Sequence, residues 1–341
     1  MKRAISLIMA LLLTILLSAC GGGTPTQSPA TSPSPSVSAS SSTSPAPKEI
    51  SLAYISRGMS DPYAAWLANT AERIAKERGM KITIMDSGND ANTAAQQFEN
   101  AVLLKPDVII YQILAEGDIA GQIAMANAED IPVILVNRVY AAQPDITYTV
   151  RCNDYDTGSI IGAFAAERLP QNAKVIIFNG MKGSVAAADR RQGFQDKLID
   201  ARPDIEVIEE DWANYNKDEA MRMMEDWLLI HDKIDGVISA NDNMSLGAIE
   251  AFKTSNRDFS EVQFFGIDGL ADGCTSIERG ELTGSVLQDA DVIATKAIDL
   301  AEELISNPSR AIEMFIMDVS LISPDNVGIY IAKHRANGLI K

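Results

Sequence analysis

The sequence predicts an α/β fold that contains two successive doubly wound parallel sheets. Short apolar runs alternate with amphipathic helical stretches, and such near-continuous apolar strands are typical of parallel sheets covered on both faces. The alternation breaks once and then restarts, which indicates a second unit of similar size. The folded part has about 290 residues, more than one hydrophobic core usually serves, so two lobes are expected.

The first unit shows the alternation from residue 50 onward. Apolar runs predict strands at residues 50–55, 81–85, 107–111 and 132–136. Periodic stretches between them predict helices at residues 63–78, 92–104 and 118–128. Gly79 ends the first of these helices. A break near residues 151–153 precedes a long predicted helix at residues 156–169.

The second unit repeats the pattern. Its predicted strands are residues 174–178, 206–209, 236–239, 262–265 and 282–287. Its predicted helices are residues 186–199, 218–229 and 244–253. In doubly wound sheets, ligands bind outside the carboxyl ends of the strands, so the residues after each strand are the candidates for a site.

The N-terminal residues 1–19 are predicted to be a secretory signal peptide. A basic start at Lys2 and Arg3 is followed by an apolar run that is too short to span a bilayer comfortably. Leu-Ser-Ala-Cys at its end resembles the lipobox of bacterial lipoproteins, which implies that Cys20 is acylated and begins the mature chain. The alternative is an ordinary signal peptide with an incidental cysteine.

Residues 20–48 are predicted to tether the folded part to the membrane. From Thr24 to Pro47 the chain is mostly Ser, Thr and Pro without any charge, a composition that cannot bury enough apolar surface to fold. Prolines keep such a segment extended as a semi-rigid spacer. The predicted location is therefore extracytoplasmic, at the cell membrane.

Composition limits the partners. The formal net charge is -17 and no Lys/Arg block lies outside the signal peptide, so nucleic acid and anionic lipid headgroups are poor partners, and no nucleic-acid partner is expected. Three cysteines are too few for a disulfide framework. Cys152 and Cys274 are expected to be buried free thiols.

Polar planar side chains and aromatic rings follow the predicted strands. Carboxylates and guanidinium groups can bridge two neighbouring hydroxyls, and aromatic faces suit the C–H face of a pyranose, so the pattern favours a polyhydroxy ligand. For single residues a structural explanation stays open, because Asp61 and Asn241 could cap helices and Asp268 could form a turn.

Little in the sequence supports catalysis. Nucleophile-elbow, Walker and His-Glu-x-x-His motifs are all missing from it. His231 and His334 are expected at the surface or at helix ends, far from the strand ends. The chain is therefore predicted not to be an enzyme, although an exported glycosidase remains an alternative to be decided by an assay for sugar turnover.

Several stretches resemble the sugar-binding lipoproteins of ABC importers, whose two-lobed fold is that of the ribose- and galactose-binding proteins. The resemblance covers residues 49–341 and is most specific at residues 131–138, 238–248 and 265–269. Residues 212–228 and 284–290 are close to the galactose/glucose type. It implies a periplasmic-binding-protein fold of type I: two doubly wound parallel-sheet lobes joined by a three-strand hinge.

The resemblance also implies a ligand-binding set, carried over residue by residue. Tyr63 matches an aromatic residue that covers one sugar face, and Tyr215 takes the place of a stacking tryptophan. Gln112 and Arg138 match the ribose type, and Gln288 agrees with it as well. The polar sugar contacts of the hexose-binding branch correspond to Asp61, Asn137, Arg190, Asn241 and Asp268.

Two departures from the galactose/glucose type are visible. Ser184 and Ala186 replace a His and an Asp that this type places after its Gly-rich turn, which puts exact galactose specificity in doubt. The calcium-binding loop is replaced by the short residues 170–172, so no bound calcium is expected. No other metal and no cofactor are expected either.

The family's architecture implies three crossings between lobes, near residues 151–153, 288–290 and 321–324. The lobes would then be residues 49–152 plus 289–321, and residues 153–288 plus 322–341. Ligand would bridge both lobes and stabilise the closed state by hinge closure, for which periplasmic binding proteins are a standard example.

The resemblance implies a monomer that captures a monosaccharide, a hexose by the branch residues above, and delivers it to an ABC permease. The main alternative is a receptor of the same fold that feeds a chemoreceptor or a histidine kinase. A repressor of the lactose-repressor family is excluded, because a signal peptide and tether occupy the place of its helix-turn-helix.

Overall fold

The computed structural model describes residues 49–114, 119–140, 142 and 146–341. These described residues form one compact unit. The predicted signal peptide, Cys20 and the tether lie outside the described residues, and so does Asp118, the predicted first residue of a helix. Within the described residues, no helix has the length and apolar character needed to cross a membrane.

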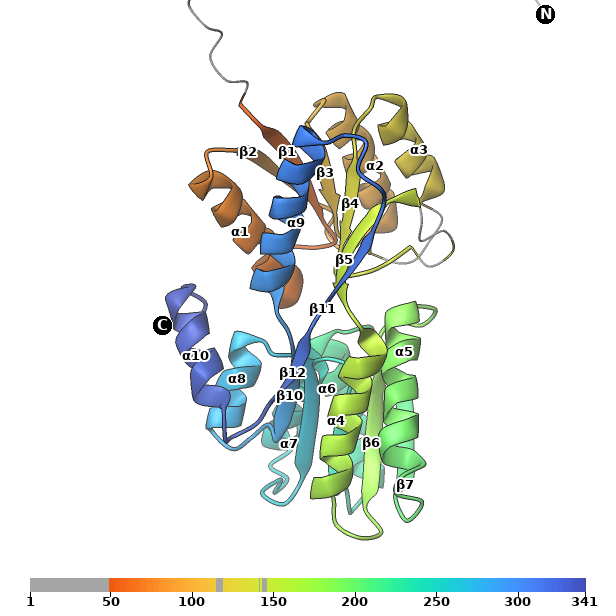
Figure 1. Ribbon diagram of the computed structural model, residues 1–341. Helices are drawn as coiled ribbons and strands as arrows, with labels where there is room; N and C mark the ends of the chain where they lie inside the picture. The colour runs from red at the N-terminus through yellow and green to blue at the C-terminus, as the bar shows by residue number, and fades with distance from the viewer. Residues whose placement is uncertain (1–48, 115–118, 141, 143–145) are drawn as a thin grey trace, which may run out of the picture. The chain divides into compact units, whose positions relative to one another are not determined.

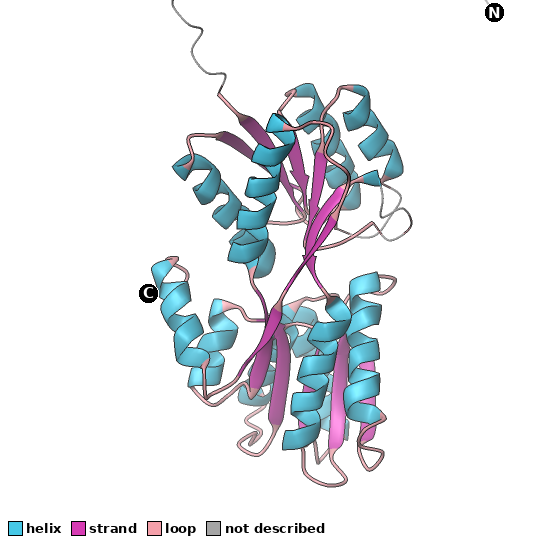
Figure 2. Cartoon of the chain, viewed as in Figure 1, coloured by secondary structure: helices cyan, strands magenta, loops and turns pink. Residues whose placement is uncertain are grey.

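The first lobe is built on a six-stranded, fully parallel sheet (Figures 1 and 2). Buried apolar residues of β1, β3, β4 and β5 fill its centre, which is why these short segments are strands. In spatial order the strands are β11 (Met314–Met317), β5 (Tyr148–Cys152), β4 (Val133–Val136), β3 (Val108–Tyr111), β1 (Ser51–Ser56) and β2 (Lys81–Asp86).

The second lobe is built on another six-stranded sheet. All neighbouring pairs are parallel except β10 and β12, which are antiparallel. In spatial order the strands are β12 (Val319–Ile322), β10 (Gly284–Gln288), β9 (Gln263–Asp268), β8 (Gly236–Ser239), β6 (Lys174–Asn179) and β7 (Glu206–Trp212).

Helices cover both faces of each sheet (Figure 1). Alternate residues of β1 show this directly: Leu52 and Tyr54 join one buried cluster with Trp66, whereas Ala53 and Ile55 join another. The first lobe has α1 (Pro62–Glu77), α2 (Ala91–Leu103), α3 (Ala120–Ala128) and α9 (Ala290–Ser306). The second has α4 (Asp154–Arg168), α5 (Val185–Phe194), the π-helical turn η2 (Gln195–Ile199), α6 (Lys217–Ile230), α7 (Asp242–Thr254), α8 (Ala271–Glu278) and α10 (Val327–Ala336).

The two parallel-sheet lobes confirm the predicted fold class. The break expected near residues 151–153 is wrong in part, because β5 occupies Tyr148–Cys152 and ends just before α4. The single helix expected at residues 186–199 is also wrong in part, since α5 gives way to η2 at Gln195. Cys152 and Cys274 are buried and free, as predicted, and burial raises the pKa of each thiol to about 12.

The chain passes between the lobes three times. It leaves the first sheet between β5 and α4, and it returns between β10 and α9. The third crossing is at Asp318, where β11 of the first sheet is followed by β12 of the second (Figure 1). The boundary expected after residue 321 therefore falls inside β12. β11 and β12 come from one nearly continuous apolar run, so the sequence does not show where the chain passes from one lobe to the other.

Candidate ligand-binding site

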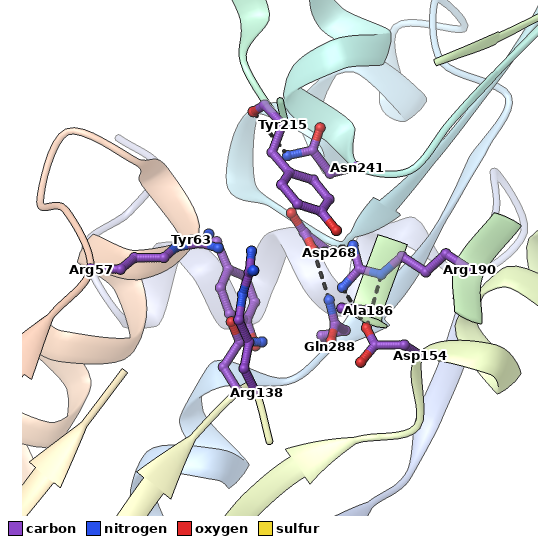
Figure 3. A pocket seen from close by; sticks show the side chains of 11 residues that line it. Arg57, Tyr63, Arg138, Asp154, Ala186, Arg190, Tyr215, Asn241, Asp268 and Gln288 are labelled. Atoms are coloured by element: carbon purple, nitrogen blue, oxygen red, sulfur yellow. Dashed lines mark hydrogen bonds and ion pairs between the residues drawn. The ribbon is translucent and has the colours of Figure 1, made fainter. Parts of the chain in front are cut away.

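A buried polar pocket lies between the two lobes, at the carboxyl ends of the parallel strands (Figure 3). Its most exposed lining residue, Tyr215, is only 8% exposed, so the lobes close over it. It is lined by Arg57, Tyr63, Asn137, Arg138, Asp154, Ala186, Arg190, Tyr215, Asn241, Asp268 and Gln288.

Arg190 is fixed at the floor of the pocket by protein groups alone. Its Nε donates to Asp154 Oδ1 at 2.9 Å, and its Nη1 donates to the carbonyl of Ala240 at 2.6 Å. Asp154 begins α4 after Asn153 has capped that helix, and it also accepts from Arg151 at 3.0 Å. Burial acts to lower the pKa of Arg190, but the combined effects of Asp154, Tyr215 and Asp268 outweigh burial and raise it. The guanidinium therefore stays charged and oriented.

Asp268 ends β9 with its carboxyl group in the pocket. Its φ of 119° is a strained value for a residue with a side chain, and such strain is typical of functional positions. Gln288 Nε2 donates to its Oδ1 at 2.8 Å, and Arg190 Nη1 lies 3.8 Å from the same oxygen. Burial raises the pKa of Asp268 to about 6, although Arg190 acts to lower it. Above that pH the group accepts hydrogen bonds only.

Asp242 and His334 stabilise the turn that follows Asp268. Asp242 Oδ2 accepts from the amide of Leu270 at 2.8 Å, and His334 Nε2 lies 2.9 Å from the carbonyl oxygen of Gly269. The prediction that His334 lies far from the strand ends is therefore wrong, because the chain packs α10 against α8. His231 follows the last residue of α6, as expected, and lies 2.8 Å from Glu209.

Arg138 and Asn137 come from the end of β4 in the first lobe. Arg138 Nη1 donates to the carbonyl of Leu114 at 3.0 Å and to Ser184 Oγ, in the second lobe, at 3.4 Å. Asn137 has a φ of 68°, and its Oδ1 accepts from Gln112 Nε2 at 3.4 Å. Gln112 thus lies behind the pocket and contacts it through Asn137.

Two tyrosines supply the aromatic surface. The Tyr215 ring lies 5.3 Å from the guanidinium of Arg138 and 5.6 Å from that of Arg190, measured to the ring centroid. Gly180 makes room for this ring, because a Cβ there would lie 2.2 Å from Tyr215 Cζ. Tyr63, in the first turn of α1, is 1% exposed.

Asn241 caps a helix and also lines the pocket. Its Oδ1 accepts from the amide of Met244 at 3.0 Å and so caps α7, while its Nδ2 donates to the carbonyl of Tyr215 at 3.2 Å. The cap foreseen as the structural explanation is therefore present at a residue that also lines the pocket.

Asp61 also caps a helix and lies beside the pocket instead of lining it. Its Oδ1 accepts from the amide of Ala64 at 3.0 Å, and its Oδ2 accepts from Arg57 Nη2 at 2.8 Å. Arg57 and Asp154 line the pocket although sequence reasoning missed them. Arg57 directly follows β1, so the search of residues after each strand could have found it. Asp154 follows no predicted strand and lies before the helix predicted at residues 156–169, so the same search would not have found it.

Several buried polar atoms in and behind the pocket have no hydrogen-bond partner within the described part of the chain. They include a donor, two acceptors and two hydroxyl groups, which can do either. An unpaired buried polar group costs about 1–3 kcal/mol, so a ligand that pairs with these groups is strongly favoured. The atoms are Arg57 Nε, Gln112 Oε1, Gln288 Oε1, Tyr63 Oη and Tyr215 Oη.

Among the described residues, no three His, Cys, Asp or Glu side chains are grouped so that they could hold a metal ion. The partners of Asp154 and Asp268 are arginines and amides instead. The pocket thus offers hydrogen bonds, ion pairs and aromatic rings, the chemistry of binding.

The fold and this site are those of a solute-binding protein, and the chain belongs to the periplasmic binding protein domain family, whose model matches residues 52–309. The resemblance inferred from the sequence is thereby confirmed. Family membership places the chain outside the cytoplasm and makes it a binding protein, which confirms the prediction that it is not an enzyme.

The chain is similar over most of its length to characterised members. It is 29% identical over 305 residues to the ribose import binding protein RbsB of Bacillus subtilis, covering 89% of this chain and 94% of that one. It is 29% identical over 259 residues to a xylitol-binding protein of Mycolicibacterium smegmatis, covering 75% and 72% respectively. A myo-inositol-bound ABC transporter solute-binding protein from Bacillus halodurans C-125 superposes with a TM-score of 0.75 at 25% identity, covering 84% and 98%.

Proposed function

We propose that this chain captures a neutral monosaccharide in the pocket between its lobes and delivers it to an ABC permease. The unpaired buried atoms carry the proposal. Arg57 Nε needs an acceptor and Gln288 Oε1 needs a donor, while the Asp268 carboxylate beside them can accept hydrogen bonds in addition to the one from Gln288. A sugar hydroxyl is both donor and acceptor, so a ring of hydroxyls pairs with all of them. An anionic ligand would bring further acceptors against Gln288 and Asp268.

Characterised relatives support this class of ligand. The ligands in their names are ribose, xylitol and myo-inositol, all neutral and polyhydroxylated. Within the class we propose a hexose or a close relative. Asn137 keeps the amide of the hexose-binding branch, and small Ala186 leaves one side of the pocket apolar and tolerant of a larger ring. Galactose and glucose should bind more weakly than in the proteins that this chain resembles.

A ligand panel tests the proposal. Calorimetry at pH 7.5, where the Asp268 carboxyl is mostly ionised, would use D-glucose, D-galactose, D-ribose, D-xylose, xylitol and myo-inositol. At least one of them should bind, and the same compound should raise the melting temperature because only the folded state binds it. No binding by any of them would refute the proposed function. Ribose binding at least tenfold tighter than every hexose would refute the choice of a hexose only.

Delivery to a permease is preferred to the sensory alternative. The characterised import binding protein of Bacillus subtilis aligns over almost its whole length, and the import role comes from that likeness. A receptor that feeds a chemoreceptor or a histidine kinase would bind the same sugars. Loss of uptake of the bound sugar after deletion of the gene would favour import; unchanged uptake with a lost transcriptional or chemotactic response would favour sensing.

We also propose that Cys20 carries a lipid that anchors the protein to the membrane. The basic start, the apolar run and Leu-Ser-Ala-Cys support this. Mass spectrometry of protein from membranes should find an acylated Cys20 and no peptide from residues 1–19. Cys20→Ser should release the protein from the membrane fraction without changing its sugar affinity. An unmodified Cys20 in secreted protein would contradict the anchor.

A further inference from the structure

We propose that Arg57 is a ligand contact that determines which sugar hydroxyl this pocket requires, and that Asp61 acts only by positioning Arg57. The inference rests on the proposed function and deepens it. It also replaces the role expected for Asp61, a direct sugar contact, with an indirect one.

Arg57 has the features of a residue built to meet a ligand. It directly follows β1, is 7% exposed and lines the pocket (Figure 3). Its Nη2 is paired with Asp61, but its buried Nε has no partner among the residues that the structure describes. A purely structural arginine at this depth would have that donor satisfied, because an unpaired buried N–H is costly.

Asp61 is occupied by protein groups on both oxygens. Oδ1 accepts from the amide of Ala64 at the start of α1, and Oδ2 accepts from Arg57. Both the helix cap and the ion pair hold the carboxylate at one place, so it can fix the direction of the guanidinium. Asp61 does not line this pocket but lines the adjoining hollow beside Tyr215, and we infer that it acts on the ligand through Arg57.

Arg57 lies on the opposite side of the pocket from Asp154 and Asp268 (Figure 3). Burial acts to lower its pKa, but the attraction of Asp61 and of Asp268, in the second lobe, outweighs burial and raises it. A hydroxyl between the two lobes can accept from Arg57 Nε and donate to the Asp268 carboxylate. That hydroxyl would connect the lobes through the ligand and favour the closed state. A sugar without it would leave both groups unpaired and bind much more weakly.

A double-mutant cycle tests both parts of the inference. Arg57→Gln, Asp61→Asn and the double variant would be titrated calorimetrically with D-glucose, D-galactose, D-ribose and xylitol. Arg57→Gln should weaken binding about ten- to a hundredfold, the value of a hydrogen bond to a charged group. Asp61→Asn should weaken binding about three- to tenfold in the parent and less than twofold when Arg57 is already Gln. Asparagine can still cap α1, which limits effects on folding.

Monodeoxy derivatives of whichever of these compounds binds would locate the hydroxyl. One derivative should bind the unmodified protein at least tenfold more weakly than the complete sugar does. The same derivative should lose little further affinity in Arg57→Gln. Arg73 and Glu77 form an exposed pair with the same i,i+4 spacing in α1, so Arg73→Gln with Glu77→Gln is the matched control and should change nothing.

Three outcomes would overturn the inference. Unchanged affinity in Arg57→Gln would make the Arg57–Asp61 pair structural. An equal cost of Asp61→Asn in both backgrounds would show that Asp61 contacts the sugar independently. A uniform loss across all deoxy derivatives would remove the role in specificity. If the parent protein binds none of the compounds, the proposed function itself fails and the inference falls with it, which is a separate and recognisable result.

Discussion

Replacing Arg190 with leucine is expected to weaken sugar binding at least about a hundredfold and to lower the free energy of unfolding by about 3–5 kcal/mol. Asp154 would lose the donor on its Oδ1, and Asp268 would lose its nearest cation, 3.8 Å away. Both carboxylates are at least 94% buried, where water cannot replace the lost partner. Calorimetry and chemical denaturation measure the two effects.

The neighbouring arginine provides a matched control. Arg191 pairs with Glu210 in a partly exposed position, so Arg191→Leu should cost no more than about 1 kcal/mol and leave affinity unchanged. Arg190→Lys retains the charge but loses the two-sided contact with Asp154 and Ala240, so it should fold and still bind poorly. Wild-type affinity in Arg190→Lys would show that guanidinium geometry does not matter here.

The two lobes could be predicted because the apolar runs that form their strands can be recognised from the local sequence. Residues 50–55, 174–178 and 236–239 are apolar throughout or nearly so, and each became a strand within a residue or two of the predicted bounds. β5 was not predicted as a strand, because polar Thr149 and Arg151 interrupt its apolar residues. Both side chains are buried, and Arg151 is paired with Asp154. The partner that makes such a residue acceptable in a core cannot be read from the strand itself.

The sequence predicts which strand ends contribute residues to the site, but it does not predict which of these residues bond to one another. Eight of the ten proposed ligand-binding residues line one pocket; Gln112 lies behind Asn137, and Asp61 lies behind Arg57. Which residues touch a ligand and which hold others depends on contacts between distant segments. Asp154 and Arg190 are 36 residues apart in the chain, so neither marks the other in the sequence.

The backbone conformation of several residues that line the pocket could not be predicted from the sequence either. Asn137, Tyr215 and Asp268 all have positive φ, and each presents its side chain to the pocket from a sharp change of chain direction. Asparagine and aspartate adopt left-handed backbone values more easily than tyrosine, but the φ of 119° at Asp268 lies outside that left-handed range, so only Asn137 carries a sequence signal for its conformation. At the other two, the surrounding contacts impose it: Tyr215 is held by Asn241, and the turn after Asp268 is held by Asp242.

Gly158→Ala is expected to lower the free energy of unfolding by about 3 kcal/mol and to weaken sugar binding, although residue 158 does not line the pocket. A Cβ at this position of α4 would lie 2.2 Å from the carbonyl oxygen of Arg190 and 2.7 Å from its Cα. These are backbone atoms of α5, so the clash can be relieved only by moving α5 away from α4. Asp154 is on α4 and Arg190 is on α5, so the movement would separate the ion pair that orients Arg190.

The same reasoning supplies the test and its control. Gly193 faces α4 from α5, where a Cβ would lie 2.4 Å from the amide nitrogen of Ser159, so Gly193→Ala should reproduce both effects. Gly121 lies in helix α3, and a Cβ there would meet no neighbour within 4 Å in the described part of the chain, so Gly121→Ala should be neutral or slightly stabilising. Denaturation and calorimetry on the three variants compare stability with affinity. If Gly158→Ala lost stability but kept full affinity, the helix spacing would not determine how Arg190 meets the sugar.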